Sequence, residues 1–101
     1  MKSKRSKLCD ISQKTKEIVW ERDCHRCIIC GNPQAMPNAH YIPRSKGGLG
    51  IEQNIVTLCA NCHFKTDHTT SRPIMLEMIK SHLQGKYEGW NEQELIYRKG
   101  V

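Results

Sequence analysis

Two Cys-x-x-Cys pairs constrain the fold of this chain more than any other feature: Cys27 with Cys30, and Cys59 with Cys62. Such a pair turns the backbone so that two sulfur atoms converge, and two pairs supply the tetrahedral sulfur set that Zn²⁺ prefers. Gly31 directly follows the first pair and permits the positive φ that this kind of turn needs. The spacing therefore predicts one structural zinc ion bound by these four cysteines.

The spacing says less about the roles of the two other cysteines, Cys24 and Cys9. Cys24 also forms a Cys-x-x-Cys pair with Cys27, so it is an alternative ligand to Cys30, although the later pair with its glycine is the better match. Cys9 stands alone near the N-terminus and is expected to be a spare thiol.

Chain length explains why a metal would matter to the fold. A chain of 101 residues supports one domain, and it buries only roughly 60–70% of the surface that its unfolded form exposes, so its core alone would be marginal. A structural zinc site contributes on the order of 10–16 kcal/mol of binding energy to folding. The sequence has no apolar run of about 18–20 residues and its N-terminus is not a secretory signal, so we expect a cytoplasmic protein without membrane contact. In a reducing cytosol, six cysteines favour metal ligands or spare thiols over a disulfide framework.

Positive charge is concentrated at the N-terminus. The formal net charge is +6, and residues 1–7 contain four basic residues and no acidic one, which leaves 12 basic against 10 acidic residues in the rest of the chain. We therefore expect a disordered basic tail over residues 1–10 and a single domain over residues 11–101. Such a tail is attracted to polyanions, of which nucleic acid is the commonest, and the alternative is a leader that only aids solubility.

Hydrophobic periodicity and turn residues predict an α+β fold with one β-hairpin and several helices. Strands are expected over 39–42 and 55–58, separated by the glycine-rich loop 43–54. Helices are expected over 12–23, 62–70, 71–85 and about 91–97. The side chains expected to face the core from the first and third of these helices are Ile18, Val19, Ile74, Met75, Met78, Ile79 and Leu83.

Four polar residues within and just beyond the cysteine frame form a second group: His40, Asn54, His63 and Asp67. His63 and Asp67 are four residues apart on an expected helix, so their side chains share one face and can bind a single divalent ion. His40 lies in the first strand of the hairpin that leads into this helix. This combination can supply a general base for water and an ion that neutralises a scissile phosphate.

The string AHYIPRSKGGLGIEQNIVTLCANCHFKTDH, framed by CIIC, closely resembles the HNH nucleases, also called ββα-metal or His-Me finger nucleases. Three features carry the resemblance: a His followed by a hydrophobic-x-Pro-x-Ser-x-Gly-Gly loop, an Asn at the end of that loop, and a His directly after the second cysteine pair. The resemblance covers about residues 20–70, and the flanks look like short HNH proteins of phages and prophages. It implies a ββα-metal core with C-terminal helices over 71–99, and a DNA endonuclease.

The resemblance also implies a role for each residue of the second group. His40 would be the general base, Asn54 would hold the loop and orient His40, and His63 would bind the catalytic ion with help from Asp67. This ion would be Mg²⁺ or Mn²⁺, with Ni²⁺ or Zn²⁺ as alternatives because one ligand is an imidazole. Many relatives have a metal-binding Asp or His directly before the base, whereas this chain has Ala39.

The expected substrate is DNA, with Arg44 and Lys46 in the loop beside His40 contacting its phosphates. One hairpin and helix provide one active site, so a monomer would nick, and double-strand cleavage would need a homodimer or two visits. The phage resemblance adds a packaging or recombination partner as an expectation. Two alternatives stay open: a non-catalytic, zinc-stabilised nucleic-acid-binding module, and a partner-binding domain that uses the helix over residues 74–83.

Overall fold

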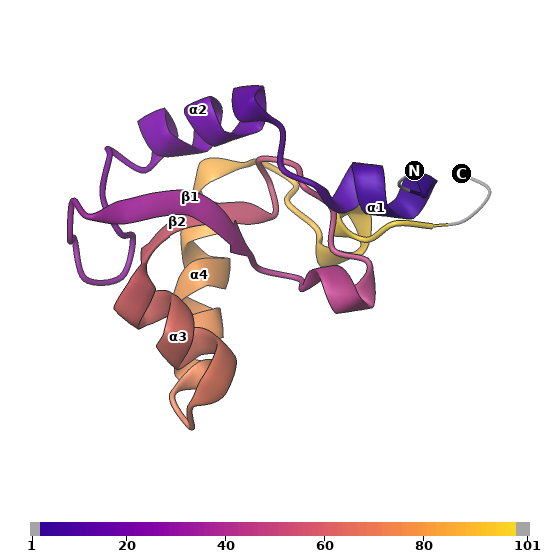
Figure 1. Ribbon diagram of the computed structural model, residues 1–101. Coiled ribbons are helices and arrows are strands. Elements are labelled where there is room, and N and C mark those ends of the chain that lie inside the picture. The colour runs from indigo at the N-terminus through magenta and orange to yellow at the C-terminus, as the bar shows by residue number, and fades with distance from the viewer. Residues whose placement is uncertain (1–2, 99–101) are drawn as a thin grey trace.

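A two-stranded antiparallel hairpin lies at the centre of the computed structural model, which describes residues 3–98 (Figure 1). Its strands are β1 (Ala35–His40) and β2 (Ile55–Cys59). The helices are α1 (Lys4–Cys9), α2 (Gln13–Arg22), α3 (Ala60–His68) and α4 (Arg72–Lys86), with 3-10 turns η1 (Arg44–Lys46) and η2 (Glu92–Leu95). The α+β fold expected from the sequence is confirmed, whereas the first two residues of the expected tail and position 99 of the expected C-terminal helices lie outside the described residues.

The first strand begins earlier than the sequence predicts. β1 runs from Ala35, which pairs with Cys59, to His40, which pairs with Ile55, and the register shifts between Met36 and Ala39. The expected strand over 39–42 is therefore wrong at both ends, because the observed strand begins at Ala35 and ends at His40. Pro37 lies within the register shift, where its missing N–H costs no ladder hydrogen bond, so a turn-rich sequence can still pair with β2.

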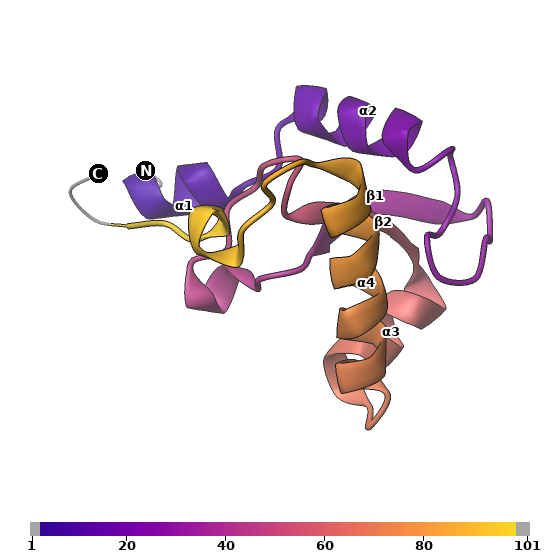
Figure 2. The same cartoon turned by 180° about the vertical axis from the view of Figure 1, so that it is seen from behind.

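Helix α2 runs along one side of the hairpin and α3 and α4 lie on the other side (Figures 1 and 2). Ser12 caps α2 by accepting a hydrogen bond from the Thr15 N–H at 3.1 Å, as its position in the sequence predicts. Val19 is fully buried, but Ile18, which was also expected to face the core, is exposed.

Helix α4 crosses behind the hairpin and contributes Met75, Ile79 and Leu83 to the core (Figure 2). The prediction that Ile74 and Met78 share this buried face is wrong, because they are 69% and 44% exposed. Residues 75, 79 and 83 are spaced by one helical turn and point at the hairpin, whereas 74 and 78 lie about 100° away around the helix.

The segment over which the sequence predicts a disordered tail, residues 1–10, includes a short helix. Residues Lys4–Cys9 form α1, and the Cys9 side chain is buried. Arg5 donates hydrogen bonds to the carbonyl oxygens of Arg44 and Ser45, each at 3.2 Å. Contacts with the loop between the strands therefore hold this segment, and charge composition alone could not predict them.

The C-terminal segment contacts the same loop. Gly48 forms an isolated bridge with Ile96, and the Leu49 N–H donates to the Leu95 carbonyl at 2.8 Å. Both chain ends therefore enclose the loop that follows β1. Within residues 3–98, no helix is long and apolar enough to cross a bilayer.

Candidate metal centre and active site

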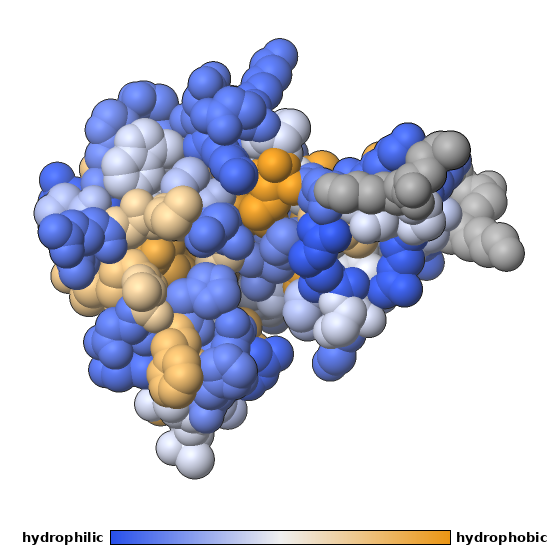
Figure 3. Space-filling view, in the orientation of Figure 1, coloured by the Kyte–Doolittle hydropathy of each residue, from blue (hydrophilic) through white to orange (hydrophobic). Residues whose placement is uncertain are grey.

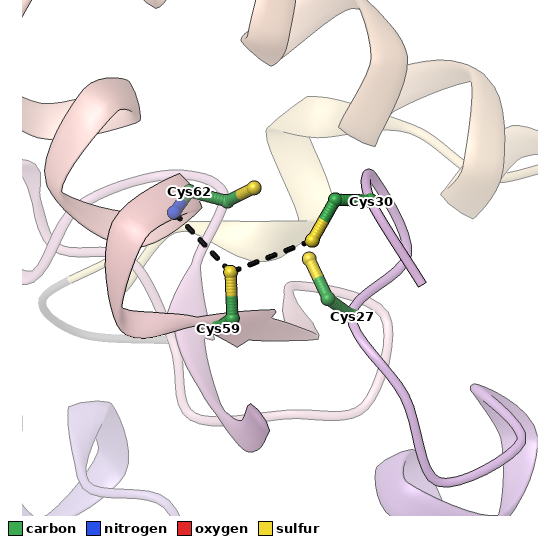
Figure 4. A group of neighbouring side chains, drawn as sticks. All are labelled: Cys27, Cys30, Cys59 and Cys62. Atoms are coloured by element: carbon green, nitrogen blue, oxygen red, sulfur yellow. Dashed lines mark hydrogen bonds between the residues drawn. The ribbon is translucent and has the colours of Figure 1, made fainter. Parts of the chain in front are cut away.

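The four cysteines of the two pairs meet at one end of the hairpin (Figure 4). Cys59 ends β2, Cys62 lies in the first turn of α3, and Cys27 and Cys30 lie on the turn that precedes β1. The four Sγ atoms are all within 4.8 Å of one another, and the Sγ atoms of Cys30 and Cys59 are 3.6 Å apart. Tetrahedral Zn²⁺ with bonds of about 2.3 Å separates its sulfur ligands by about 3.8 Å, so the cluster fits zinc.

The acidity of these thiols and the repulsion between their thiolates also bear on cation binding. Burial, followed by hydrogen bonds with the neighbouring thiols, raises the pKa of Cys62. Burial would also raise the pKa of Cys27, but backbone N–H groups outweigh it and lower that pKa to about 7. Four thiolates at this spacing repel one another unless a positive charge lies between them. Gly31 has the positive φ, 79°, that the spacing predicts, and Cys24 is exposed and outside the cluster.

Asn54 closes the loop at the other end of the hairpin. Its side chain is fully buried. Its Oδ1 accepts from the Ile42 N–H at 2.8 Å, and its Nδ2 donates to the carbonyls of Leu49 at 2.8 Å and Ile42 at 3.2 Å. The amide thus joins both sides of the loop beside His40, and its effect on the orientation of His40 stays a prediction.

His40 is the last residue of β1 and is partly buried. Its Nε2 lies 2.8 Å from the carbonyl oxygen of Cys9. Burial lowers the pKa of His40, the hydrogen bond to Cys9 opposes this effect, and the charges of Arg44 and His63 lower the pKa further. The imidazole is therefore neutral near pH 7 and can accept a proton.

His63 and Asp67 lie one turn apart on α3. Their Nδ1 and Oδ2 atoms are 3.1 Å apart and both side chains are partly exposed. At this distance the two side chains pair directly with each other. Adjacent ligands of an octahedral ion with bonds of about 2.1 Å are also about 3 Å apart, so the same spacing is compatible with a shared divalent ion. Within the described residues, no third His, Cys, Asp or Glu completes a cluster around the pair, and Ala39 is buried in the core.

A surface hollow of about 730 Å³ lies beside this pair. Apolar side chains such as Met36 and Phe64 line it together with His63 and Asp67, and Figure 3 shows apolar residues gathered over this side of the molecule. His40 is not part of its lining. The proposed ion site is thus open to solvent, whereas the cysteine cluster is largely enclosed.

The predicted phosphate contacts lie on η1, directly after the His40 strand. Arg44 is partly exposed and is held by the Cys9 carbonyl and by an ion pair with Asp10, each at 2.8 Å. Lys46 is exposed. Their contact with DNA stays a prediction.

Sequence reasoning missed a buried polar network at the end of α2. Arg22 pairs with Asp23 at 2.8 Å, and Asp23 accepts hydrogen bonds from the Thr57 N–H and from His82 on α4. Burial would raise the pKa of Asp23, but the bonds with His82 and Arg22 lower it to about 2. The network ties α2 and α4 to β2, and its one sequence signal is an Arg-Asp pair at the end of a predicted helix.

Residues 27–78 match the HNH endonuclease family. This range contains all four clustered cysteines as well as His40, Asn54 and the His63–Asp67 pair. The chain belongs to this family. A curated relative named anaredoxin, from a Nostoc species, is 35% identical over 54 residues, which are 52% of this chain and 71% of anaredoxin. Two segments of this HNH protein enclose the loop that follows β1: residues 3–10 and 95–97. Both segments lie outside the family match.

Proposed function

We propose that this HNH protein is an endonuclease that depends on a divalent metal and hydrolyses DNA phosphodiester bonds. The observation that carries the proposal is the placement of His40 at the end of β1, in the hairpin that leads into α3 with its His63–Asp67 pair. Membership of the HNH endonuclease family supports a nuclease hydrolase acting on DNA. The four-cysteine cluster supports a separate zinc ion that stabilises the fold.

In this proposal His40 takes a proton from the attacking water as its oxygen bonds to phosphorus. The bond from phosphorus to the 3′ oxygen breaks and the leaving oxygen takes up a proton from solvent, so the products carry 5′-phosphate and 3′-hydroxyl ends. General-base catalysis of this kind is worth about 10²–10⁴-fold in rate. A base that is neutral at pH 7 suits this step, and the lowered pKa of His40 provides one.

The other residues of the proposed site bind the ion, hold the loop beside His40 or contact the DNA. His63 and Asp67 would hold the divalent ion, which supplies positive charge to neutralise the scissile phosphate. Asn54 keeps the loop after His40 closed through its three hydrogen bonds, so the imidazole keeps its place while DNA binds. Arg44 and Lys46 add positive charge on the same loop, where phosphates would approach.

A plasmid-nicking assay across Mg²⁺, Mn²⁺ and EDTA tests the proposal on the wild type, His40→Ala and His25→Ala. His25 is a matched control because its exposed side chain pairs with Glu21 on the surface. We expect His40→Ala to lose at least about 100-fold in nicking rate, while zinc content, helical content and DNA binding stay at wild-type values. Nicking by His40→Ala at the wild-type rate would refute the assignment of the base.

The same assay separates the proposed enzyme from its alternatives. A non-catalytic nucleic-acid-binding module predicts DNA binding without metal-dependent nicking in the wild type. A partner-binding domain, for which the exposed Ile74 and Met78 on α4 are the supporting observation, predicts no affinity for DNA. The ratio of nicked to linear plasmid at early times also distinguishes nicking from double-strand cleavage.

A further inference from the structure

Cys9, which lies outside the family match, contacts the proposed general base through its carbonyl oxygen. The geometry points to a positioning role: the Cys9 carbonyl keeps the imidazole proton of His40 on Nε2 and thereby makes Nδ1 the atom that accepts the proton from water. This inference rests on the proposed function for its catalytic part. The hydrogen bond itself can be tested without any cleavage.

The tautomer follows from the contact between the two groups. Nε2 of His40 is 2.8 Å from the Cys9 carbonyl oxygen, and a carbonyl oxygen can only accept a hydrogen bond. Nε2 must therefore carry a hydrogen. A neutral imidazole has one N–H, so its lone pair for accepting a proton is on Nδ1. Without the carbonyl, either tautomer and either ring orientation would be available.

The position of this carbonyl does not depend on His40. The Gly50 N–H donates to the Leu8 carbonyl at 2.9 Å. Arg44 donates to the Cys9 carbonyl through Nη1 and pairs with Asp10 through Nη2, each at 2.8 Å. The Cys9 side chain is 2% exposed. The fold thus presents the acceptor to the imidazole before any substrate arrives.

Gly50 allows this close approach. A Cβ atom at position 50 would lie 2.0 Å from the carbonyl oxygen of Asp10 and 2.5 Å from its carbonyl carbon. Both are backbone atoms, so any larger residue at position 50 must push residues 8–10 away from the loop. Gly85 on α4 is a matched control, because a Cβ there would meet nothing within 4 Å.

The same contact could instead block the base, since the Cys9 carbonyl covers one of its two nitrogens. A blocking segment must leave before catalysis, but residues 8–10 are held by Gly50, Arg44 and the burial of Cys9. The observations therefore favour positioning. The two roles predict opposite effects of displacing the segment, because displacement slows a positioned base and accelerates a blocked one.

NMR of the full-length, zinc-loaded protein with ¹⁵N-labelled histidine tests the contact, since long-range ¹⁵N–¹H correlations identify the tautomer of each imidazole. His40→Gln assigns the signal. We expect a single Nε2–H tautomer for His40 in the wild type and in Gly85→Ala, and a mixture in Gly50→Ala. An Nδ1–H tautomer in the wild type would overturn the inference, and this measurement stands even if Gly50→Ala fails to fold.

Steady-state nicking kinetics test the catalytic part. We expect Gly50→Ala to lower kcat at least about tenfold with KM changed less than about twofold, because the base loses its orientation while DNA binding persists. Gly85→Ala should match the wild type in both constants. A faster Gly50→Ala, or an unchanged kcat with a mixed tautomer, would overturn the positioning role. A wild type with the Nε2–H tautomer but no nicking would refute the proposed function and the catalytic part, while the hydrogen bond would stand.

Discussion

The two ends of the hairpin are closed by different means. At the end where Ala35 pairs with Cys59, four sulfur atoms converge within 4.8 Å. At the end where His40 pairs with Ile55, the buried amide of Asn54 and the carbonyl of Cys9 hold the strand and its loop by hydrogen bonds. One end therefore offers a set of metal ligands, and the other is held by hydrogen bonds between side chains and backbone groups.

This difference determines how strongly a single substitution affects the structure at each end of the hairpin. At the cysteine end, the binding energy of a zinc ion would be concentrated in four side chains, so the loss of one ligand would affect the whole site. At the His40 end, the stability is spread over many hydrogen bonds, each worth about 1 kcal/mol. A change there should disturb the geometry of the proposed base more than it disturbs the fold.

The largest expected effect is at the cysteine end. Cys59→Ser should remove one of four zinc ligands and lose part of the roughly 10–16 kcal/mol that a complete site contributes, so that the protein is unfolded or fails to accumulate. Metal analysis and thermal denaturation measure this, and Cys24→Ser is the matched control because Cys24 is exposed and outside the cluster. Folded wild-type protein with well below one zinc per chain would contradict the prediction.

An intermediate effect is expected for the loop at the His40 end. Asn54→Ala removes a buried amide with three hydrogen bonds and should lower the free energy of unfolding by about 3 kcal/mol. Urea denaturation measures this change, and zinc content should stay at the wild-type value. Asn38→Ala, at an exposed position of β1, should change stability by less than about 0.5 kcal/mol. Loss of zinc from Asn54→Ala would show that the two ends are not independent.

The smallest effect belongs to the polar network that ties α2 and α4 to β2. The pKa of Asp23 is about 2 in the fold and 3.8 ordinarily, so its carboxylate stabilises the fold fully above pH 3.8 and loses this effect as the pH falls toward 2. Asp23→Asn should therefore cost about 2 kcal/mol at pH 7. Urea denaturation measures this loss in the free energy of unfolding, and pH 7 is chosen because cysteine thiolates can bind zinc at that pH. Glu21→Gln, whose partner His25 is on the surface, should cost under about 0.5 kcal/mol, and equal losses for the two variants would contradict the role of the network.

The cysteine end could be predicted from the sequence because the residues that specify each cysteine pair are close together in the chain. Three-residue spacing within each pair is enough to bring two sulfurs together, and Gly31 signals the turn. The helix over Gln13–Arg22 was predictable for the same reason, since Ser12 and the positions that follow it carry a local pattern. Asn54 was identified by its place at the end of a recognisable loop, and the structure adds the three bonds that its amide makes.

The His40 end could not be predicted fully because its key acceptor is a backbone carbonyl. Every residue has a carbonyl, so nothing in the sequence marks Cys9 as the partner of His40, which is 31 positions away. Gly50 resembles the other loop glycines, and only the fold shows that Asp10 leaves no space for a side chain there. Likewise, the basic residues near Cys9 read as a solvated tail because charge says nothing about the contacts of Arg5 with the loop.

The enclosure of one loop by segments that are distant in sequence has a consequence for the entropy of folding. Cys30 and Cys59, whose Sγ atoms lie together in the cysteine cluster, are 29 positions apart. The hydrogen bonds of Leu49 and Gly47 to residues 95 and 97 join groups that are 46 and 50 positions apart. Because the entropy cost of closing a loop rises with its length, the cysteine cluster costs less chain entropy to close than the surroundings of His40.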